Sequence, residues 1–143
     1  MRRPMTIATL IALLVGILRA ADASEIGGPV SHVRDGDTLV VAGTAIRLQG
    51  LDAPELREPG GADAARLLRS LVAGRRLRCT LDGTRSFDRR VGICSTDGQD
   101  LAALLVAAGV ARDCPRYSGG RYAPLETAAA RMLPRHRYCL PRP

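Results

Sequence analysis

The chain has 143 residues, which suffices for one domain of ordinary size and excludes two. All 21 basic residues are arginines, against 14 acidic residues, so the formal net charge is +7. A positive surface attracts polyanions, but an arginine-only composition also follows from coding bias, so charge alone favours a nucleic-acid partner only weakly.

Residues 1–23 are expected to form a secretory signal peptide. Two arginines precede an apolar run over residues 5–18, and Ala-Asp-Ala at positions 21–23 is a small-x-small cleavage site. A retained anchor is the alternative, but the run is shorter than the roughly 20 apolar residues of a spanning helix. Cleavage after Ala23 would leave a secreted or periplasmic single domain, residues 24–143, with 18 basic and 13 acidic residues and a net charge near +5.

The stretch 30–51 predicts three consecutive strands. The segments Val30 to Val33 and Thr38 to Ala42 flank Asp35-Gly36-Asp37, and Asp-Gly between apolar runs is typical of a tight hairpin. A second glycine break precedes the third strand, residues 45–51. A three-stranded meander is therefore expected.

The next segments predict a helix followed by a pair of strands. Apolar residues recur every three or four positions over residues 62–73, whereas they alternate with other residues over 75–81 and 90–95. If these two strands pair, Cys79 and Cys94 could face each other across the ladder.

The C-terminal part predicts two helices separated by a loop. A helix is expected over residues 100–108, because Asp100 is a suitable N-cap. Residues 113–122 contain a proline and two adjacent glycines and predict a loop. A third helix is expected over residues 125–133, followed by a proline-rich tail, residues 134–143.

Four cysteines follow the expected cleavage point, and an even number in an exported chain favours disulfides. Four cysteines allow three pairings. We favour Cys79–Cys94 across the predicted strands and Cys114–Cys139, which would hold the tail against the body. No pair has the spacing of a zinc site, and the two histidines are far apart in sequence, so zinc is disfavoured.

The predicted order of elements is three strands, a helix, two strands and two further helices. Five short strands with a helix between the third and fourth are typical of a small closed barrel of the OB type. We therefore expect an α+β fold, a five-stranded OB-type β-barrel with about three helices, in a single domain.

Acidic side chains and one arginine gather at the strand ends of the predicted meander. Asp35 and Asp37 lie in the first turn, Arg47 lies in the third strand, and Asp52 follows that strand. Taken alone, an Asp-Gly-Asp sequence is most often an ordinary turn. Folding the hairpin back could bring Asp37 close to Asp52, however, and two carboxylates with a backbone carbonyl make an oxygen-rich site for a hard cation such as calcium.

The joint pattern resembles the staphylococcal nuclease (thermonuclease) family. The resemblance covers about residues 30–118 and is carried by Val33 to Thr38, Ile46-Arg47-Leu48, Leu51 to Glu55 and Asp97 to Ala111. The chain is similar in particular to small exported bacterial members of this family that have extra cysteines. The resemblance implies a calcium-dependent nuclease that hydrolyses DNA or RNA. A monomer is the default expectation, and no stable association with a membrane is expected after the signal peptide is cleaved.

The resemblance also implies roles for individual acidic residues. Asp37 and Asp52 would be the calcium carboxylates, with the backbone carbonyl of Ala53 as a third ligand. Asp35 would hold a water bound to the calcium. Glu55 would orient or deprotonate the attacking water.

Two arginines are implied to bind the phosphate. Arg47 looks like the first of them and Arg89 like the second. The family usually shows Tyr-Gly-Arg where this chain has Phe87-Asp88-Arg89, so Arg90 is the alternative for the second position. Arg89 is preferred because it keeps the spacing to the strand that follows.

Few aromatic side chains are available to stack on bases. Phe87 and Tyr117 fall where the family places aromatic residues near the bound nucleotide, whereas Tyr122 and Tyr138 are expected to be packing residues. Binding driven mostly by the phosphates, with weak sequence preference, is therefore expected.

Two other functions remain as alternatives. One is a catalytically inactive OB-fold module that binds nucleic acid, and the other is a disulfide-stabilised interaction protein of the cell envelope. A binding module would not need two calcium carboxylates, a general base and a phosphate-binding arginine together. An interaction protein should expose an apolar patch, and the sequence shows no obvious one. The nuclease is the favoured hypothesis.

Overall fold

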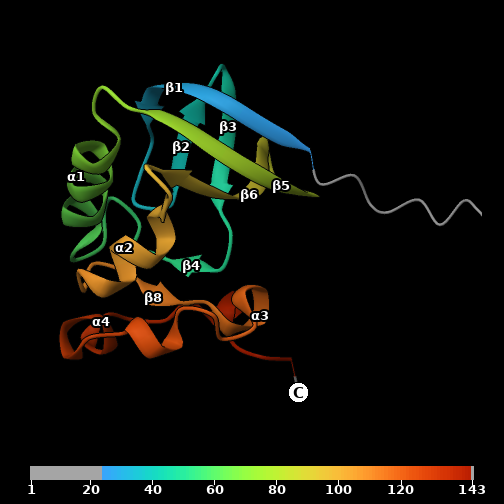
Figure 1. Cartoon of the computed structure of the whole chain (residues 1–143). Helices are drawn as coiled ribbons and strands as arrows, with labels where there is room; N and C mark the ends of the chain where they lie inside the picture. Colours follow the sequence, from blue (N-terminus) through green and yellow to red (C-terminus); the bar gives the residue numbers. More distant parts are fainter. Residues whose placement is uncertain (1–23, 143) are drawn as a thin grey trace, which may run out of the picture.

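The computed structural model describes residues 24–142 and shows a mixed α+β fold with a mostly antiparallel sheet. The expected signal peptide, residues 1–23, lies outside the described residues. Within residues 24–142, none of the helices has the length and apolar character needed to cross a bilayer. The large sheet occupies the upper part of the molecule in Figure 1, and α2, α3 and α4 lie below it.

The predicted meander is confirmed. Strands β1 (Glu25–Val33), β2 (Thr38–Val41) and β3 (Thr44–Leu48) pair consecutively and antiparallel, with β2 and β3 in a register that sets Thr38 opposite Arg47. The first strand begins before the predicted Val30, because its N-terminal half pairs with β5.

The second predicted strand pair is also present and is longer than expected. Strands β5 (Arg76–Ser86) and β6 (Arg89–Thr96) are antiparallel, and Cys79 lies opposite Cys94, to which it is disulfide-bonded. The pairing order is β3-β2-β1-β5-β6-β7, where β7 is Gln99–Asp100. Strand β3 also pairs with β6 in parallel, so the C-terminal half of β3 lies beside the N-terminal half of β6.

Two helices lie where the apolar spacing predicted them. Helix α1 (Gly61–Val72) and helix α2 (Leu101–Ala107) pack against the sheet, and the side chain of Asp100 caps α2 by accepting from two backbone N–H groups. Together with the sheet they bury a continuous apolar core. Its fully buried members include Leu39, Val41, Ile46, Leu48, Leu51, Leu68, Leu81, Leu101, Leu105 and Val106.

The segment predicted as a loop over residues 113–122 contains regular structure. Strand β8 (Arg112–Asp113) pairs with β4 (Leu51–Asp52), and the short helix α3 (Pro115–Ser118) follows. Proline fits the first position of a helix, because a backbone N–H at that position would have no acceptor within the helix. The loop prediction was wrong here because the two glycines lie after this helix.

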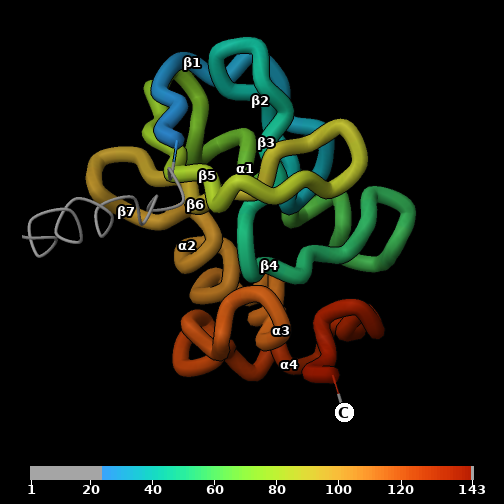
Figure 2. Tube along the Cα trace, turned by 90° about the vertical axis from the view of Figure 1, so that its right-hand side faces the viewer, coloured from blue at the N-terminus to red at the C-terminus, as the bar shows by residue number. Residues whose placement is uncertain are grey.

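The predicted helix over residues 125–133 is present only in its C-terminal part. The structure has a 3-10 turn, η2 (Ala123–Leu125), and a separate helix α4 (Ala128–Met132). Glu126 is extended between them because its side chain is held by other parts of the chain, and Thr127 then caps α4. Figure 2 shows α3, α4 and the C-terminal segment together at the end of the molecule opposite β1.

A disulfide and the side chain of Glu126 are among the contacts that hold the C-terminal segment. A last 3-10 turn, η3 (Arg137–Cys139), is disulfide-bonded through Cys139 to Cys114, as the sequence led us to expect. The carboxylate of Glu126 accepts hydrogen bonds from the Arg135 guanidinium (3.0 Å) and from the Asp113 backbone N–H (3.0 Å).

The carboxylate of Glu126 should stabilise the fold at neutral pH. Burial raises its pKa, but the hydrogen bond from Asp113 and the charges of Arg112 and Arg135 outweigh burial and lower it. A lowered pKa contributes stability that is present above the ordinary pKa of a glutamate and is lost as the pH falls. Glu126→Gln should therefore lower the free energy of unfolding by about 1–3 kcal/mol at pH 7, and by less at pH 4, in urea titrations.

A matched control is the exposed pair of Asp63 and Arg66 on helix α1. Asp63→Asn removes a carboxylate that is largely in solvent, so the change should stay below about 0.5 kcal/mol at either pH. Equal losses for both variants, or a Glu126→Gln loss that does not shrink at pH 4, would contradict the assignment.

Candidate functional site

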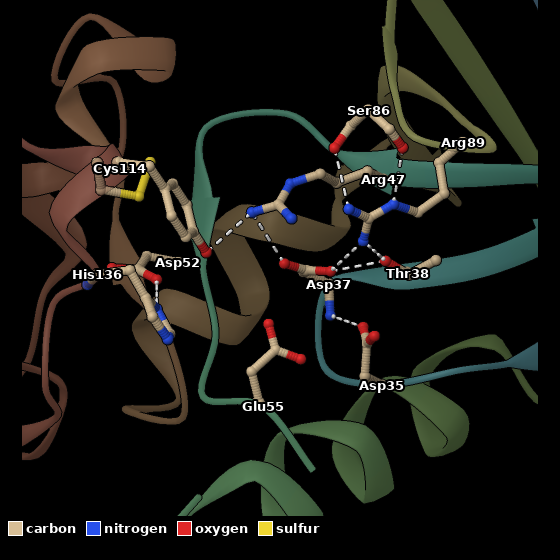
Figure 3. A network of polar contacts seen from close by, with 12 residues as sticks. Asp35, Asp37, Thr38, Arg47, Asp52, Glu55, Ser86, Arg89, Cys114 and His136 are labelled. Carbon is tan, nitrogen blue, oxygen red and sulfur yellow. Dashed lines mark hydrogen bonds and ion pairs between the residues drawn. A yellow bond between two sulfur atoms is a disulfide. The ribbon is translucent and has the colours of Figure 1, made fainter. Parts of the chain in front are cut away.

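The centre of the site is a buried carboxylate, Asp37, in the turn between β1 and β2. Its Oδ1 accepts from the Thr38 hydroxyl (2.7 Å), and its Oδ2 lies 3.2 Å from Nη2 of Arg47. Nη1 of Arg89 lies 3.7 Å from Oδ1. Asp35 accepts the backbone N–H of Asp37 at 3.0 Å. Four of the sequence-predicted residues therefore meet here (Figure 3).

The sequence of the turn is required by its packing against helix α1. A Cβ at Gly36 would lie 2.6 Å from the Cβ of Ala64 and 2.9 Å from that of Ala53, so only glycine fits. The backbone N–H of Leu48 donates to the carbonyl of Asp37 at 2.8 Å, which ties the end of β3 to the turn. The backbone at Asp37 is thus held from two sides.

Burial changes the acidity of Asp37. Desolvation raises the pKa of this carboxyl to about 6, the charge of Arg47 opposes the rise, and the nearby carboxylate of Asp35 adds to it. Near neutral pH the carboxylate is therefore charged and depends on the arginines around it.

The two predicted arginines reach Asp37 from different strands. Arg89, the first residue of β6, donates Nε and Nη2 to the carbonyl (3.1 Å) and hydroxyl (2.9 Å) of Ser86, and Nη1 to the Thr38 hydroxyl (2.8 Å). Arg90 makes no side-chain hydrogen bond or ion pair with any residue in the range 24–142. The structure therefore places Arg89 rather than Arg90 beside Asp37.

The other predicted calcium carboxylate, Asp52, contacts the C-terminal segment. Its side chain is fully buried, its Oδ2 accepts the backbone N–H of His136 (2.9 Å), and its Oδ1 lies 2.6 Å from the ring Nδ1. Nε2 of His136 lies 3.3 Å from Glu58. Burial lowers the pKa of His136, but the hydrogen bonds and charges of Asp52 and Glu58 outweigh it and raise the pKa. Among the described residues, no hydrogen bond joins Asp52 to Asp37.

Glu55 is exposed in the segment between β4 and α1. Its backbone N–H donates to the carboxylate of Glu58 at 2.7 Å. A Cβ at Gly61 would lie 1.8 Å from the Glu55 carbonyl oxygen, so this glycine lets the helix start against the segment. In the view of Figure 3 the Glu55 side chain points toward the space between Asp37 and Asp52.

The site contains one residue for which the sequence predicted only packing. Nη2 of Arg47 donates to the hydroxyl of Tyr138 at 3.1 Å, and the guanidinium carbon lies 5.3 Å from the ring centroid. The ring does pack, since it stacks on His136, but position in the sequence did not tell that the tail docks beside Arg47. The adjacent Cys139, with its expected bond to Cys114, was the available signal that Tyr138 lies against the body of the domain.

A pocket with a volume of about 480 Å³ opens beside the arginines. It contains the predicted aromatic residues Phe87, which is 92% exposed, and Tyr117, which is 51% exposed. Tyr122 is buried and donates its hydroxyl to Asp100, so it packs as expected. The lining also includes Arg47, Leu48, Gln49, Gly50, Leu51, Asp82, Thr84, Arg85, Ser86, Arg89, Val91, Cys114 and Tyr138.

The predicted metal ligands offer oxygen atoms, which suit a hard cation, but Asp37 and Asp52 already pair with other side chains. Asp37, Asp52 and the carbonyl of Ala53 offer oxygen atoms alone, which is the donor type that calcium prefers. Within residues 24–142, no three His, Cys, Asp or Glu side chains lie close enough to hold a metal by themselves. Because arginine pairs with Asp37 and His136 with Asp52, a cation would have to share or displace these partners.

Comparison with known proteins places the chain among named relatives, although no family model matches it. It is 35% identical over 136 residues to "Succinoglycan biosynthesis protein ExoI" of Rhizobium meliloti (strain 1021), covering 87% of this chain and 71% of that protein. It is 31% identical over 117 residues to an "Uncharacterized endonuclease" of Escherichia coli O157:H7, covering 78% and 76%. A protein of the same name from Escherichia coli matches equally. This chain belongs to the family that contains these proteins, two of which are named as endonucleases.

Proposed function

We propose that this chain is an exported, calcium-dependent nuclease of the staphylococcal nuclease type that hydrolyses phosphodiester bonds of DNA or RNA. The observation that carries the proposal is the convergence of Arg47 and Arg89 on the buried Asp37, beside a pocket with aromatic side chains. The names of the two Escherichia coli relatives support a nuclease.

The proposal includes a closed OB-type barrel of five strands. It is supported by the pairing of β3 with β6, because the order β3-β2-β1-β5-β6 returns to β3 through this contact. Closure of this kind leaves none of the five strands without two neighbours. It also places the ends that carry Arg47 and Arg89 side by side.

The two arginines would bind the phosphate that is cleaved. Arg47 uses Nη2 for its contacts with Asp37 and Tyr138, and within residues 24–142 its Nε and Nη1 have no side-chain acceptor. Arg89 is held by Ser86 and Thr38, so its charge is fixed in place before the substrate arrives. Fixed positive charge lowers the barrier where negative charge develops on the phosphate oxygens.

The acidic residues would divide the remaining tasks. Asp37, Asp52 and the carbonyl of Ala53 would hold calcium, and Asp35 would hold a water beside it. Bound calcium supplies positive charge that balances the carboxylates and polarises a phosphate oxygen. Glu55, which is exposed at the mouth of the site, would accept a proton from the attacking water.

The substrate class follows from the pocket. Phe87 and Tyr117 offer exposed rings on which unpaired bases can stack, and such stacking tolerates any base. Single-stranded DNA and RNA are therefore the substrates that fit this surface best.

Cleavage of single-stranded DNA by residues 24–143, with calcium and with a chelator, tests the function. We expect calcium-dependent cleavage, and a loss of at least about a hundredfold in turnover for Glu55→Gln, Arg47→Ala and Arg89→Ala, by analogy with other lost charge-stabilising groups. Arg90→Ala is the matched control and should stay within about twofold of wild type.

Each other outcome has a clear meaning. If the folded, oxidised protein bound the oligonucleotide without cleaving it, the chain would be an inactive binding module. If Arg90→Ala lost activity and Arg89→Ala did not, the assignment of the second arginine would be reversed.

Calcium affinity should depend on the protonation of Asp37. The pKa of this carboxyl is raised to about 6 by burial, and a protonated carboxyl must lose its proton before it can ligate a cation. Affinity measured by calorimetry should therefore fall by about tenfold per pH unit below pH 6. An affinity that stays constant between pH 7.5 and pH 5 would show that Asp37 is not a ligand.

Export is the last part of the proposal. Two disulfides are typical of proteins that fold outside the reducing cytosol. The mass of the protein recovered from a secreting cell should correspond to a chain that begins at Ser24. A recovered chain that still begins at Met1 would rule out the proposed cleavage.

A further inference from the structure

We infer that Tyr138 is a substrate-positioning residue, which holds Arg47 in its phosphate-binding orientation and donates a hydrogen bond from its own hydroxyl to the same phosphate. The C-terminal segment 135–140 would then be one wall of the nucleotide site. The inference rests on the proposed function, because it concerns the phosphate that the nuclease would cleave.

Asp37 and Tyr138 together hold the guanidinium of Arg47. Its Nη2 lies 3.2 Å from Asp37 Oδ2 and 3.1 Å from the Tyr138 hydroxyl oxygen. The guanidinium carbon also lies 5.3 Å from the Tyr138 ring centroid. Two partners on one nitrogen fix the orientation of the planar group, and its other nitrogens are left to meet a phosphate.

The Tyr138 hydroxyl is free to donate a hydrogen bond to a ligand in the pocket. Its oxygen accepts from Arg47, and within residues 24–142 its proton has no acceptor. Tyr138 is partly buried and lines the pocket with Arg47, Arg89 and Tyr117. A hydroxyl that accepts from an arginine is a stronger donor, because hydrogen bonds in a chain polarise one another. A phosphate oxygen in the pocket would supply the missing acceptor.

The residues on either side of Tyr138 hold it in position through a disulfide and hydrogen bonds. Cys139, the next residue, is disulfide-bonded to Cys114, which itself lines the pocket. His136 stacks on the Tyr138 ring, with centroids 5.2 Å apart and planes 11° apart, and is bonded to the buried Asp52. The ring is thus held in place by the disulfide of Cys139, which follows it in sequence, and by the hydrogen bonds of His136, which lies two residues before it.

Tyr138→Phe tests the inference, because it removes the hydroxyl and keeps the ring and its stacking. Tyr122→Phe is the matched control, since that hydroxyl donates to Asp100 and lies outside the pocket lining. Both variants are compared with wild type for kcat and KM on a single-stranded oligonucleotide. Binding of a 5′-mononucleotide and thermal unfolding are measured on the same samples.

We expect Tyr138→Phe to lower kcat by about tenfold and to weaken mononucleotide binding by about fivefold, with a melting temperature that follows the control. If wild type cleaves and Tyr138→Phe matches it in kcat and in mononucleotide binding, the inference is overturned while the nuclease stands. If wild type binds the mononucleotide but does not cleave, the nuclease fails and the binding comparison alone decides the role of Tyr138. If wild type binds no mononucleotide, both fail.

A second variant tests whether the Cys114–Cys139 disulfide, which anchors segment 135–140, positions Tyr138. The double substitution C114S/C139S should reproduce the Tyr138→Phe loss or exceed it in samples that remain folded by circular dichroism. The control C79S/C94S removes a disulfide between β5 and β6, and its folded fraction should retain wild-type kcat. Unchanged activity of folded C114S/C139S would show that the anchor does not position Tyr138.

Discussion

The arrangement of the site depends on the burial of a single charge. The carboxylate of Asp37 is 4% exposed, and an unpaired charge in such a place would cost several kcal/mol. Arg47 and Arg89 offset that cost from two strands that are neighbours only because β3 pairs with β6. The pairing of β3 with β6 therefore also brings together the two arginines that we propose to bind the phosphate.

A second constraint comes from the other end of the chain. The C-terminal segment places His136 on Asp52 and Tyr138 on Arg47, and the disulfide at Cys139 holds it there. Without any bound cation, Asp37 is thus paired with two arginines and Asp52 is hydrogen-bonded to His136. A bound cation would compete with these partners, which makes the C-terminal segment part of the energetics of the site.

Much of the fold could be predicted because its signals are local. The Asp35-Gly36-Asp37 turn, the meander and the pairing of Cys79 with Cys94 follow from turn chemistry and alternation within short stretches. The helix expected over 125–133 is interrupted at Glu126, whose carboxylate is held by Asp113 and Arg135, and the local sequence carries no signal of these contacts. His136 and Tyr138 were missed for the same reason, since their partners are more than 80 residues away.

The central feature of the proposed site is a cation that joins Asp37 and Asp52 in front of the two arginines. The most direct measurement is a crystal structure of residues 24–143 with calcium and a mononucleotide that carries a terminal phosphate. We expect calcium bound by both carboxylates and the Ala53 carbonyl, with the phosphate on Arg47 and Arg89. A phosphate bound elsewhere, or calcium that leaves Asp37 and Asp52 with their present partners, would contradict it.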